Sequence, residues 1–145
     1  MQRTLWLWIL ACGFIAPAVG EACTCPPNPT PQQAHEYSAL VFQGTVTAVD
    51  PSPEIPIAKQ VSMVVSRMWK GEPVSTIKLL TASQGNMCGY DFKVGRSYLV
   101  YAIRDAKTGT ISTNLCTRTA PLESAGEDLQ ALEALSTAPA PAPPK

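Results

Sequence analysis

Hydrophobic and polar residues alternate through the central part of the chain. The clearest alternation is in two sets of three apolar residues, namely Val61, Met63 and Val65, and then Tyr98, Val100 and Ala102. A period of two residues is typical of antiparallel strands with one buried and one exposed face. The pattern predicts five strands, at residues 40–49, 59–69, 74–81, 97–104 and 110–116.

The segments between these strands carry turn signals. Three prolines between residues 51 and 56 predict a loop, residues 70–73 predict a tight turn, and residues 105–109 predict a hairpin connection. Gly44 lies within the first strand and predicts a bulge or sharp bend, which a small closed barrel needs at its corners. Five short, bent strands therefore indicate a mainly β protein built as a small barrel.

Helical patterns flank the strands on both sides. Residues 31–38 permit a short helix, with Thr30 as its amino-terminal cap and Pro31 at its first position. After Pro121, five apolar residues fall on one helical face and predict a helix beside the barrel: Leu122, Ala125, Leu129, Leu132 and Leu135. Residues 136–145 are rich in alanine and proline, so we expect a disordered tail.

The first 22 residues have the features of a secretory signal peptide. Arg3 precedes an apolar run that is too short and too interrupted by proline for a membrane span. Cleavage after Gly20 leaves two residues in front of Cys23, whereas cleavage after Ala22 makes Cys23 the amino terminus. A third interpretation is a lipidated Cys12. Each interpretation predicts an exported protein, secreted or periplasmic, with one domain at residues 23–135.

The net charge of the chain gives little indication of a charged partner. Eleven lysines and arginines balance eleven aspartates and glutamates, so we expect no nucleic-acid partner. Scattered cations offer a patch for sulfated sugars, but solvated strand faces explain them more simply: Lys59, Arg67, Lys70, Lys78, Lys93 and Arg96. We expect a monomer without a membrane span.

Removing the leader leaves four of the five cysteines. An even number in an exported chain favours two disulfides among Cys23, Cys25, Cys88 and Cys116. Two alternatives remain at this point. Four thiolates can hold a zinc ion, although Cys88 and Cys116 lack the paired spacing of structural zinc sites. The string Cys23-Thr24-Cys25 can also act as a redox pair.

Catalytic motifs are missing from the sequence. His35 is the only histidine, which excludes a His-Glu-x-x-His zinc site, and there is no Gly-x-Ser-x-Gly elbow or phosphate-binding glycine loop. We therefore expect no enzymatic activity and no cofactor or metal of the protein's own.

Several short strings occur in an order that is fairly specific, above all in the spacing of the cysteines. They are Cys23-Thr24-Cys25-Pro26, Pro31-Gln32-Gln33-Ala34, residues 39–46, Trp69-Lys70-Gly71, Thr81-Ala82, Cys88-Gly89, Val94-Gly95, Tyr98-Leu99-Val100 and Leu115-Cys116. Together they resemble the tissue inhibitors of metalloproteinases, from Cys23 to about Leu122. The resemblance implies a five-stranded OB-like barrel of the netrin-like type, with flanking helices and two disulfides.

The resemblance also implies a disulfide pairing and an activity. It pairs Cys23 with Cys88 and Cys25 with Cys116. It implies a zinc metalloprotease as partner, inhibited when the free amine and the carbonyl oxygen of Cys23 chelate the protease zinc. Thr24 would enter the specificity pocket of the protease. The other residues expected to contact the protease are Cys25, Pro26, Asn86 and Met87.

One departure from the family and one rival interpretation accompany the resemblance. Glu36 stands where the family has a cysteine of a third disulfide, so that link is absent. Netrin-like barrels also occur in proteins that inhibit nothing, which makes an extracellular binding module for protein or polysaccharide the alternative function.

Overall fold

The fold is taken from a computed structural model that describes residues 23–137. The predicted signal peptide and residues 138–145 of the predicted tail lie outside the described residues.

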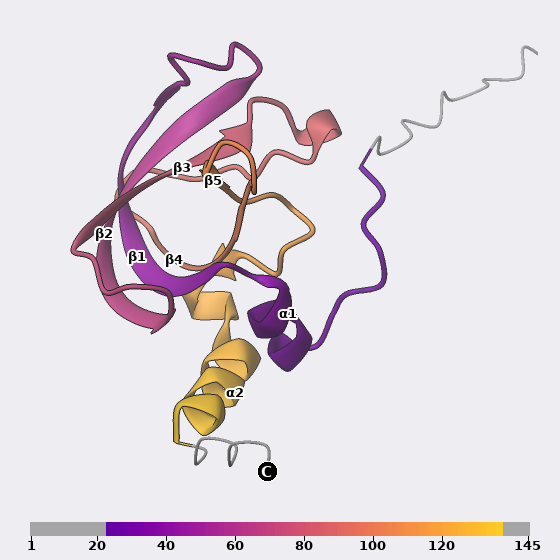
Figure 1. Ribbon diagram of the computed structural model, residues 1–145, viewed down its shortest axis with the longest axis vertical. Helices are drawn as coiled ribbons and strands as arrows, with labels where there is room; N and C mark the ends of the chain where they lie inside the picture. The colour runs from indigo at the N-terminus through magenta and orange to yellow at the C-terminus, as the bar shows by residue number, and fades with distance from the viewer. Residues whose placement is uncertain (1–22, 138–145) are drawn as a thin grey trace, which may run out of the picture.

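Five strands form a closed barrel (Figure 1). They are β1 (Leu40–Pro51), β2 (Ala58–Lys70), β3 (Thr76–Ala82), β4 (Ser97–Arg104) and β5 (Ile111–Ser112). Each neighbouring pair is antiparallel except β3 with β5, which is parallel. The order β1-β2-β3-β5-β4 returns to β1, because β1 also pairs with β4. This order confirms the predicted mainly β, five-stranded barrel with OB-like topology.

Strand β1 bends enough to pair with β2 on one side and β4 on the other. The register with β2 shifts between Gln43 and Gly44, at the position where the sequence predicts a bend. A side chain on Gly44 would bring a Cβ atom within 2.9 Å of the Val64 carbonyl oxygen. Glycine is therefore required here because the two strands approach too closely for a Cβ atom.

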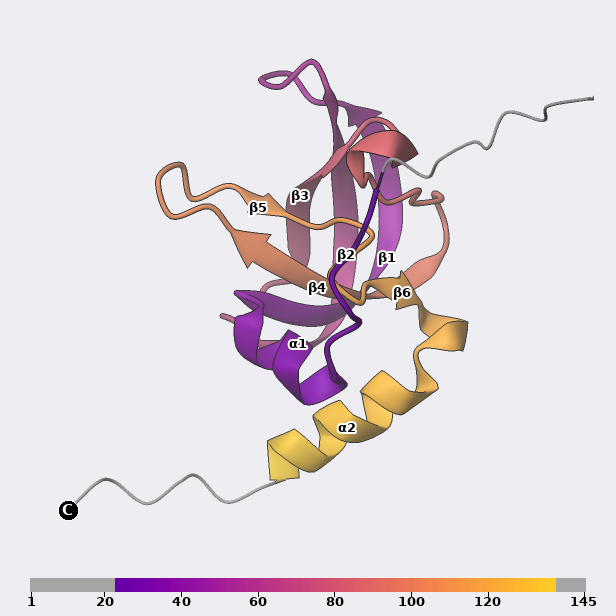
Figure 2. The ribbon, with the colours of Figure 1, turned by 90° about the vertical axis from the view of Figure 1, so that its right-hand side faces the viewer.

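Strand β4 is buried on both faces, whereas its alternation predicts burial on only one. Tyr98, Val100 and Ala102 face the barrel core, together with residues such as Phe42 and Leu79. Leu99 and Tyr101 on the other face belong to a second core with Ala34 and Leu132 from the helices. Figure 2 shows the two helices lying together below β4. The helices cover the second face of β4, which the alternation of apolar and polar residues predicts to be exposed.

The first helix, α1 (Pro31–Tyr37), has the predicted start. The Thr30 hydroxyl accepts a hydrogen bond from the Gln33 N–H, and the Gln33 side chain accepts one from the Thr30 N–H. These reciprocal bonds form a capping box, and Pro31 occupies the first turn. At the other end, Lys70 Nζ donates to the carbonyl oxygens of His35 and Glu36 at 2.7 and 2.9 Å. Both ends of α1 are thus satisfied.

The second helix starts later and ends later than its apolar pattern predicts. Leu122–Ser124 forms a 3₁₀ turn, η2, and the α-helix α2 spans Gly126–Thr137. The hydroxyl of Ser136 donates to the Leu132 carbonyl oxygen, and that of Thr137 donates to the Glu133 carbonyl oxygen. These side-chain bonds run along the last turn of α2, which includes two residues that we expected in the disordered tail.

The fifth strand is shorter than predicted, since residues 113–116 do not continue β5. The Asn114 side chain accepts a hydrogen bond from the Cys116 N–H at 2.8 Å, which forms a turn in place of a strand. A short strand that the sequence did not predict, β6 (Ala120–Pro121), then pairs with β4. The prediction missed this change because Asn-to-backbone bonds compete locally with strand pairing.

Candidate functional site

Residues 23–30, which we call the strap, cross the outside of the barrel. They contain neither helix nor strand, in keeping with three prolines at positions 26, 27 and 29. Figure 2 shows the strap running from the start of α1 toward the 3₁₀ turn η1 (Gly85–Met87). The amino-terminal end of the strap therefore lies beside the loop that carries Cys88.

Two disulfides attach the strap to the barrel. Cys23 is bonded to Cys88 and Cys25 to Cys116, and the Cα atoms in each pair are 5.3 Å apart. The pairs span sequence separations of 65 and 91 residues. This pairing is the one that the family resemblance implies, and it is confirmed.

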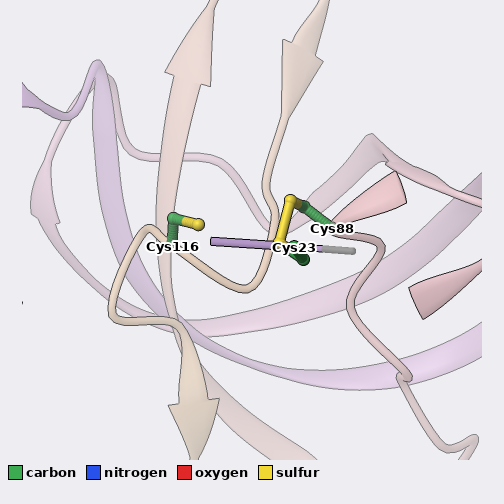
Figure 3. Close-up of side chains that lie close together, drawn as sticks. All are labelled: Cys23, Cys88 and Cys116. Carbon is green, nitrogen blue, oxygen red and sulfur yellow. A yellow bond between two sulfur atoms is a disulfide. The ribbon is translucent and has the colours of Figure 1, made fainter. Parts of the chain in front are cut away.

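The sulfur atoms of Cys23, Cys88 and Cys116 lie within 4.8 Å of one another. Figure 3 shows the Cys116 sulfur pointing toward the Cys23–Cys88 bond. All three atoms are engaged in disulfides, so they supply no thiolate for the zinc site considered above. Cys23 and Cys25 are each bonded to a distant partner and not to each other, which also disfavours the redox interpretation.

The residues expected to contact a protease lie at this end of the strap. Thr24 and Pro26 are exposed, and Cys23 and Cys25 are half-buried. Met87 precedes Cys88 and has 42% of its surface exposed. Asn86 is the middle residue of η1. The disulfide from Cys23 to Cys88 therefore joins the two predicted groups of contact residues.

The loop of Cys88 is fixed against the barrel by backbone contacts. Cys88 has a left-handed conformation, with φ of 61°, and its N–H donates to the Gly85 carbonyl oxygen. The next residue, Gly89, approaches β3 so closely that an added Cβ atom would overlap the Ala82 carbonyl oxygen. A side chain at this position would displace the loop that holds Cys23.

Tyr90 continues this attachment into the barrel. Its N–H donates to the Thr81 hydroxyl at 2.8 Å, and its ring contacts the rings of Phe92 and Tyr98. Burial raises the pKa of Tyr90 to about 12, so its hydroxyl is neutral at physiological pH. The turn after Cys88 is therefore anchored by a hydrogen bond and an aromatic cluster.

Leu115 belongs to the same edge and was missed by the sequence analysis. Its N–H donates to the Cys88 carbonyl oxygen at 3.0 Å, and 47% of its surface is exposed. The one sequence signal for Leu115 was its position next to Cys116, which is bonded to Cys25 of the strap. Leu115 and Met87 place two exposed apolar side chains beside the disulfides.

A groove adjoins this edge on the side of the β1–β2 and β4–β5 loops. It has a volume of about 670 Å³, and its lining includes Met87 together with Ile55, Ile57, Asp105 and Asn114. The β3–β5 pairing beneath it consists of a single parallel residue pair, Leu80 with Ser112. The groove thus lies over the shortest strand pairing in the barrel.

Most of the scattered cations have partners within residues 23–137. Arg67 pairs with Glu133, Lys93 with Asp91 and Arg96 with Glu123, while Lys70 binds the end of α1. These contacts favour solvated strand faces over a patch for sulfated sugars. No helix of the described part of the chain is long and apolar enough to cross a membrane.

The fold and this edge define a small barrel of OB-like topology with an extended strap held against it by two disulfides. Comparison with protein families gives a match to tissue inhibitor of metalloproteinase over residues 21–130. The chain therefore belongs to the tissue inhibitor of metalloproteinase family. A search of curated protein sequences found no match.

Proposed function

We propose that this protein inhibits a zinc metalloprotease with the end of its strap. Membership of an inhibitor family supports the proposal. The observation that carries it is the pair of disulfides from Cys23 and Cys25, because they hold an extended, exposed segment in one place on a rigid barrel. A segment ordered before binding loses less conformational entropy when it enters an active site.

In the proposed mechanism, Cys23 is the amino terminus of the mature protein. Its deprotonated amine and its carbonyl oxygen are two lone-pair donors in a five-membered chelate, and they displace water from the open zinc position of the protease. Thr24 enters the specificity pocket, while Cys25, Pro26, Asn86 and Met87 contact the walls of the active-site cleft. The zinc belongs to the protease, so the inhibitor needs no cofactor and performs no catalysis.

This mechanism requires export and cleavage after Ala22. Two disulfides fit an oxidising compartment such as the periplasm or the extracellular space. Cleavage after Gly20 would leave Cys23 with an amide nitrogen in place of a free amine, and one zinc donor would be lost. The position of cleavage is therefore the first property to measure.

The test begins with the intact mass of the exported protein. The mechanism predicts a product that starts at Cys23 and is about four hydrogens lighter than the reduced chain, because each disulfide removes two. Inhibition of a panel of zinc metalloproteases is then compared for this product and for a variant with one alanine added before Cys23. The added residue should weaken inhibition by about a hundredfold or more, since even outer-shell partners of a metal are worth 10–100-fold.

A matched control is Lys107→Ala, because Lys107 lies in the exposed β4–β5 loop and outside the strap. It should inhibit like the unmodified protein. Equal inhibition with and without the added alanine would rule out chelation by Cys23.

The alternative is a binding module that uses the groove beside Met87. The groove favours it because its apolar lining does not depend on where the chain is cut. Binding of an extracellular protein or polysaccharide that survives the added alanine and is lost in Ile57→Asp would support this alternative.

A further inference from the structure

The strap has very few hydrogen bonds to the rest of the molecule. Among residues 23–137, the segment from Cys23 to Pro29 is held by two disulfides at one end. At the other end it continues into the capped start of α1 and makes a single hydrogen bond to the rest of the molecule. That bond runs from Arg118 Nη1 to the Pro29 carbonyl oxygen at 2.9 Å. Arg118 is therefore the side chain that fixes Pro29 against the barrel.

Arg118 is itself held by a carboxylate. Its Nε and Nη2 atoms donate to the two oxygens of Asp128 at 2.8 and 2.7 Å, which is a bidentate pair. Only 17% of the Arg118 side chain and 9% of the Asp128 side chain are exposed. A planar guanidinium in this geometry is fixed in direction as well as in position, so Nη1 points toward Pro29.

The carboxylate is in turn fixed from the barrel. The buried Tyr101 hydroxyl donates to Asp128 Oδ1 at 2.7 Å, and Tyr101 belongs to β4. Asp128 lies in the first turn of α2, where a negative charge interacts favourably with the helix dipole. A continuous set of contacts therefore connects β4, α2, Arg118 and the strap.

The backbone of Arg118 is unusual in a way that fits this role. Its φ of 64° is in the left-handed region, which is unfavourable for a residue with a long side chain. This conformation occurs two residues after Cys116, which is bonded to the strap. The same loop therefore contacts the strap twice, through a disulfide and through a guanidinium.

We propose that Arg118 is a positioning residue that sets the direction in which the strap presents Cys23 and Thr24. It acts through Pro29 and does not touch the protease. The consequence for inhibition rests on the proposed function, whereas the effect on the strap does not.

The prolines of the strap explain how an effect at Pro29 reaches Thr24. Pro26, Pro27 and Pro29 each have φ restricted to about −65°, so the segment between Cys25 and Thr30 behaves as a semi-rigid rod. A disulfide has several rotatable bonds and fixes position better than direction. The direction of a rod is defined only when its second end is also held. That end continues into the capped first turn of α1, and the Arg118 bond to Pro29 fixes it against the loop of Cys116.

The chain contains a matched control for this proposal. Arg67 on β2 also makes two contacts with a carboxylate of α2, namely Nη1 to Glu133 Oε1 at 2.6 Å and Nη2 to Glu133 Oε2 at 2.7 Å. Both arginines join the barrel to α2, but only Arg118 reaches the strap. A difference between the two pairs therefore separates strap positioning from helix attachment.

The test compares two double variants of the oxidised protein. In R118M/D128N, the introduced methionine fills the volume of the arginine stem and the asparagine oxygen still accepts from Tyr101, so no charge is left unpaired in the interior. In R67M/E133Q, the other arginine pair is removed in the same way. Both proteins should remain folded, with melting temperatures within about 5 °C of the unmodified protein.

The first measurement is the backbone order parameter of Thr24 and Asn28 from ¹⁵N relaxation. We expect it to fall from about 0.85 to below about 0.6 in R118M/D128N and to stay unchanged in R67M/E133Q. Unchanged order at these residues in R118M/D128N would overturn the proposal, as would an equal fall in both variants. If R118M/D128N does not fold, the conservative variant R118K is measured in the same way with the same criteria. It keeps the positive charge but lacks the planar set of guanidinium donors.

The second measurement is the inhibition constant against a metalloprotease that the unmodified protein inhibits. R118M/D128N should weaken inhibition by about tenfold, because one hydrogen bond to a charged group no longer orients the strap. R67M/E133Q should inhibit normally. If the strap of R118M/D128N stays ordered while inhibition weakens, Arg118 does not position the strap. If the strap becomes disordered while inhibition is unchanged, the direction of the strap does not matter for inhibition. If the unmodified protein inhibits no metalloprotease, the proposed function fails, and the order parameters still decide the role of Arg118.

Discussion

The barrel and the strap are stabilised by different kinds of interaction. In the barrel, long antiparallel ladders join β1 to β2 and β4, and residues such as Phe42 and Val100 are fully buried. In the strap, Thr24 and Pro26 are exposed, and the order comes from two disulfides, Arg118 and the capped start of α1. One region is ordered by burial and backbone pairing, and the other by a few long-range bonds.

This difference explains how an exposed segment can be held for recognition. A strand paired in the sheet has its backbone groups occupied, whereas residues 23–28 of the strap keep their carbonyl groups, and the N–H groups of their non-proline residues, available to a partner. Disulfides hold the strap without using its backbone N–H and carbonyl groups. They stabilise the fold mainly by restricting the unfolded chain. The same contrast predicts which substitutions affect the whole molecule and which affect only the strap.

Removing one disulfide should have the largest effect. In the chain-entropy model, the Cys25–Cys116 bond closes a loop long enough to contribute about 4 kcal/mol. The double variant Cys25→Ser/Cys116→Ser should therefore lower the free energy of unfolding by about that amount, measured by urea denaturation. A reductant should destabilise this variant further, because it still contains Cys23–Cys88. A loss below about 1 kcal/mol would mean that the barrel is independent of the strap.

Truncation in the barrel core should destabilise the barrel and leave the strap in place. Leu79→Ala removes a side chain that is 1% exposed and should lower the free energy of unfolding by about 3 kcal/mol. Lys78→Ala, on the exposed face of the same strand, should change it by less than about 0.5 kcal/mol. Inhibition by folded Leu79→Ala protein should equal that of the unmodified protein. Weaker inhibition would show that the two regions are coupled.

The contact between the Cys88 loop and β3 offers a sharper comparison of two glycines. Gly89→Ala would push the loop away from Ala82 and should lower the free energy of unfolding by about 1–3 kcal/mol. Gly85→Ala, four residues earlier in the same loop, meets no atom within 4 Å and should be nearly neutral. Denaturation of both variants gives the comparison, and equal effects would mean that the close approach at Gly89 is not required.

The smallest effect should come from His35, at the junction of the strap and the barrel. Burial, together with the positive charge of Lys70, lowers the pKa of His35. The unfolded chain therefore binds this proton more readily, so the free energy of unfolding should decrease as pH falls below about 6.5. Urea denaturation between pH 7.5 and pH 5 should show a smaller decrease for His35→Gln. An identical pH dependence would mean that other groups are responsible.

Local pattern was enough to predict most of the barrel. Strands β1 to β4 and the cap of α1 agree with the alternation and with the Thr30-Pro31 signal, because both depend on residues close in sequence. Residues 113–116 failed as a strand because the Asn114 side chain bonded to the Cys116 backbone instead. The pattern of β4 also could not reveal that two distant helices cover its second face.

The candidate site was predictable in a different way. Cys23, Thr24 and Cys25 were proposed as site residues because their string resembles a known family, and Met87 was proposed because it precedes Cys88. The resemblance also gave the disulfide pairing, since four cysteines alone allow three pairings. Leu115 was not found, because its contact with Cys88 joins loops that are far apart in sequence.

The sequence by itself determined strands β1 to β4, the capped helix and the cysteines that hold an exposed amino-terminal segment. Only the tertiary structure brought Arg118, Asp128 and Pro29 together, across a separation of 89 residues between the arginine and the proline. Periodicity reports which face of an element is buried, but it contains no information about which distant polar group will meet another. Such a pairing is decided by how the closed barrel places α2 and the strap on either side of the Arg118 side chain.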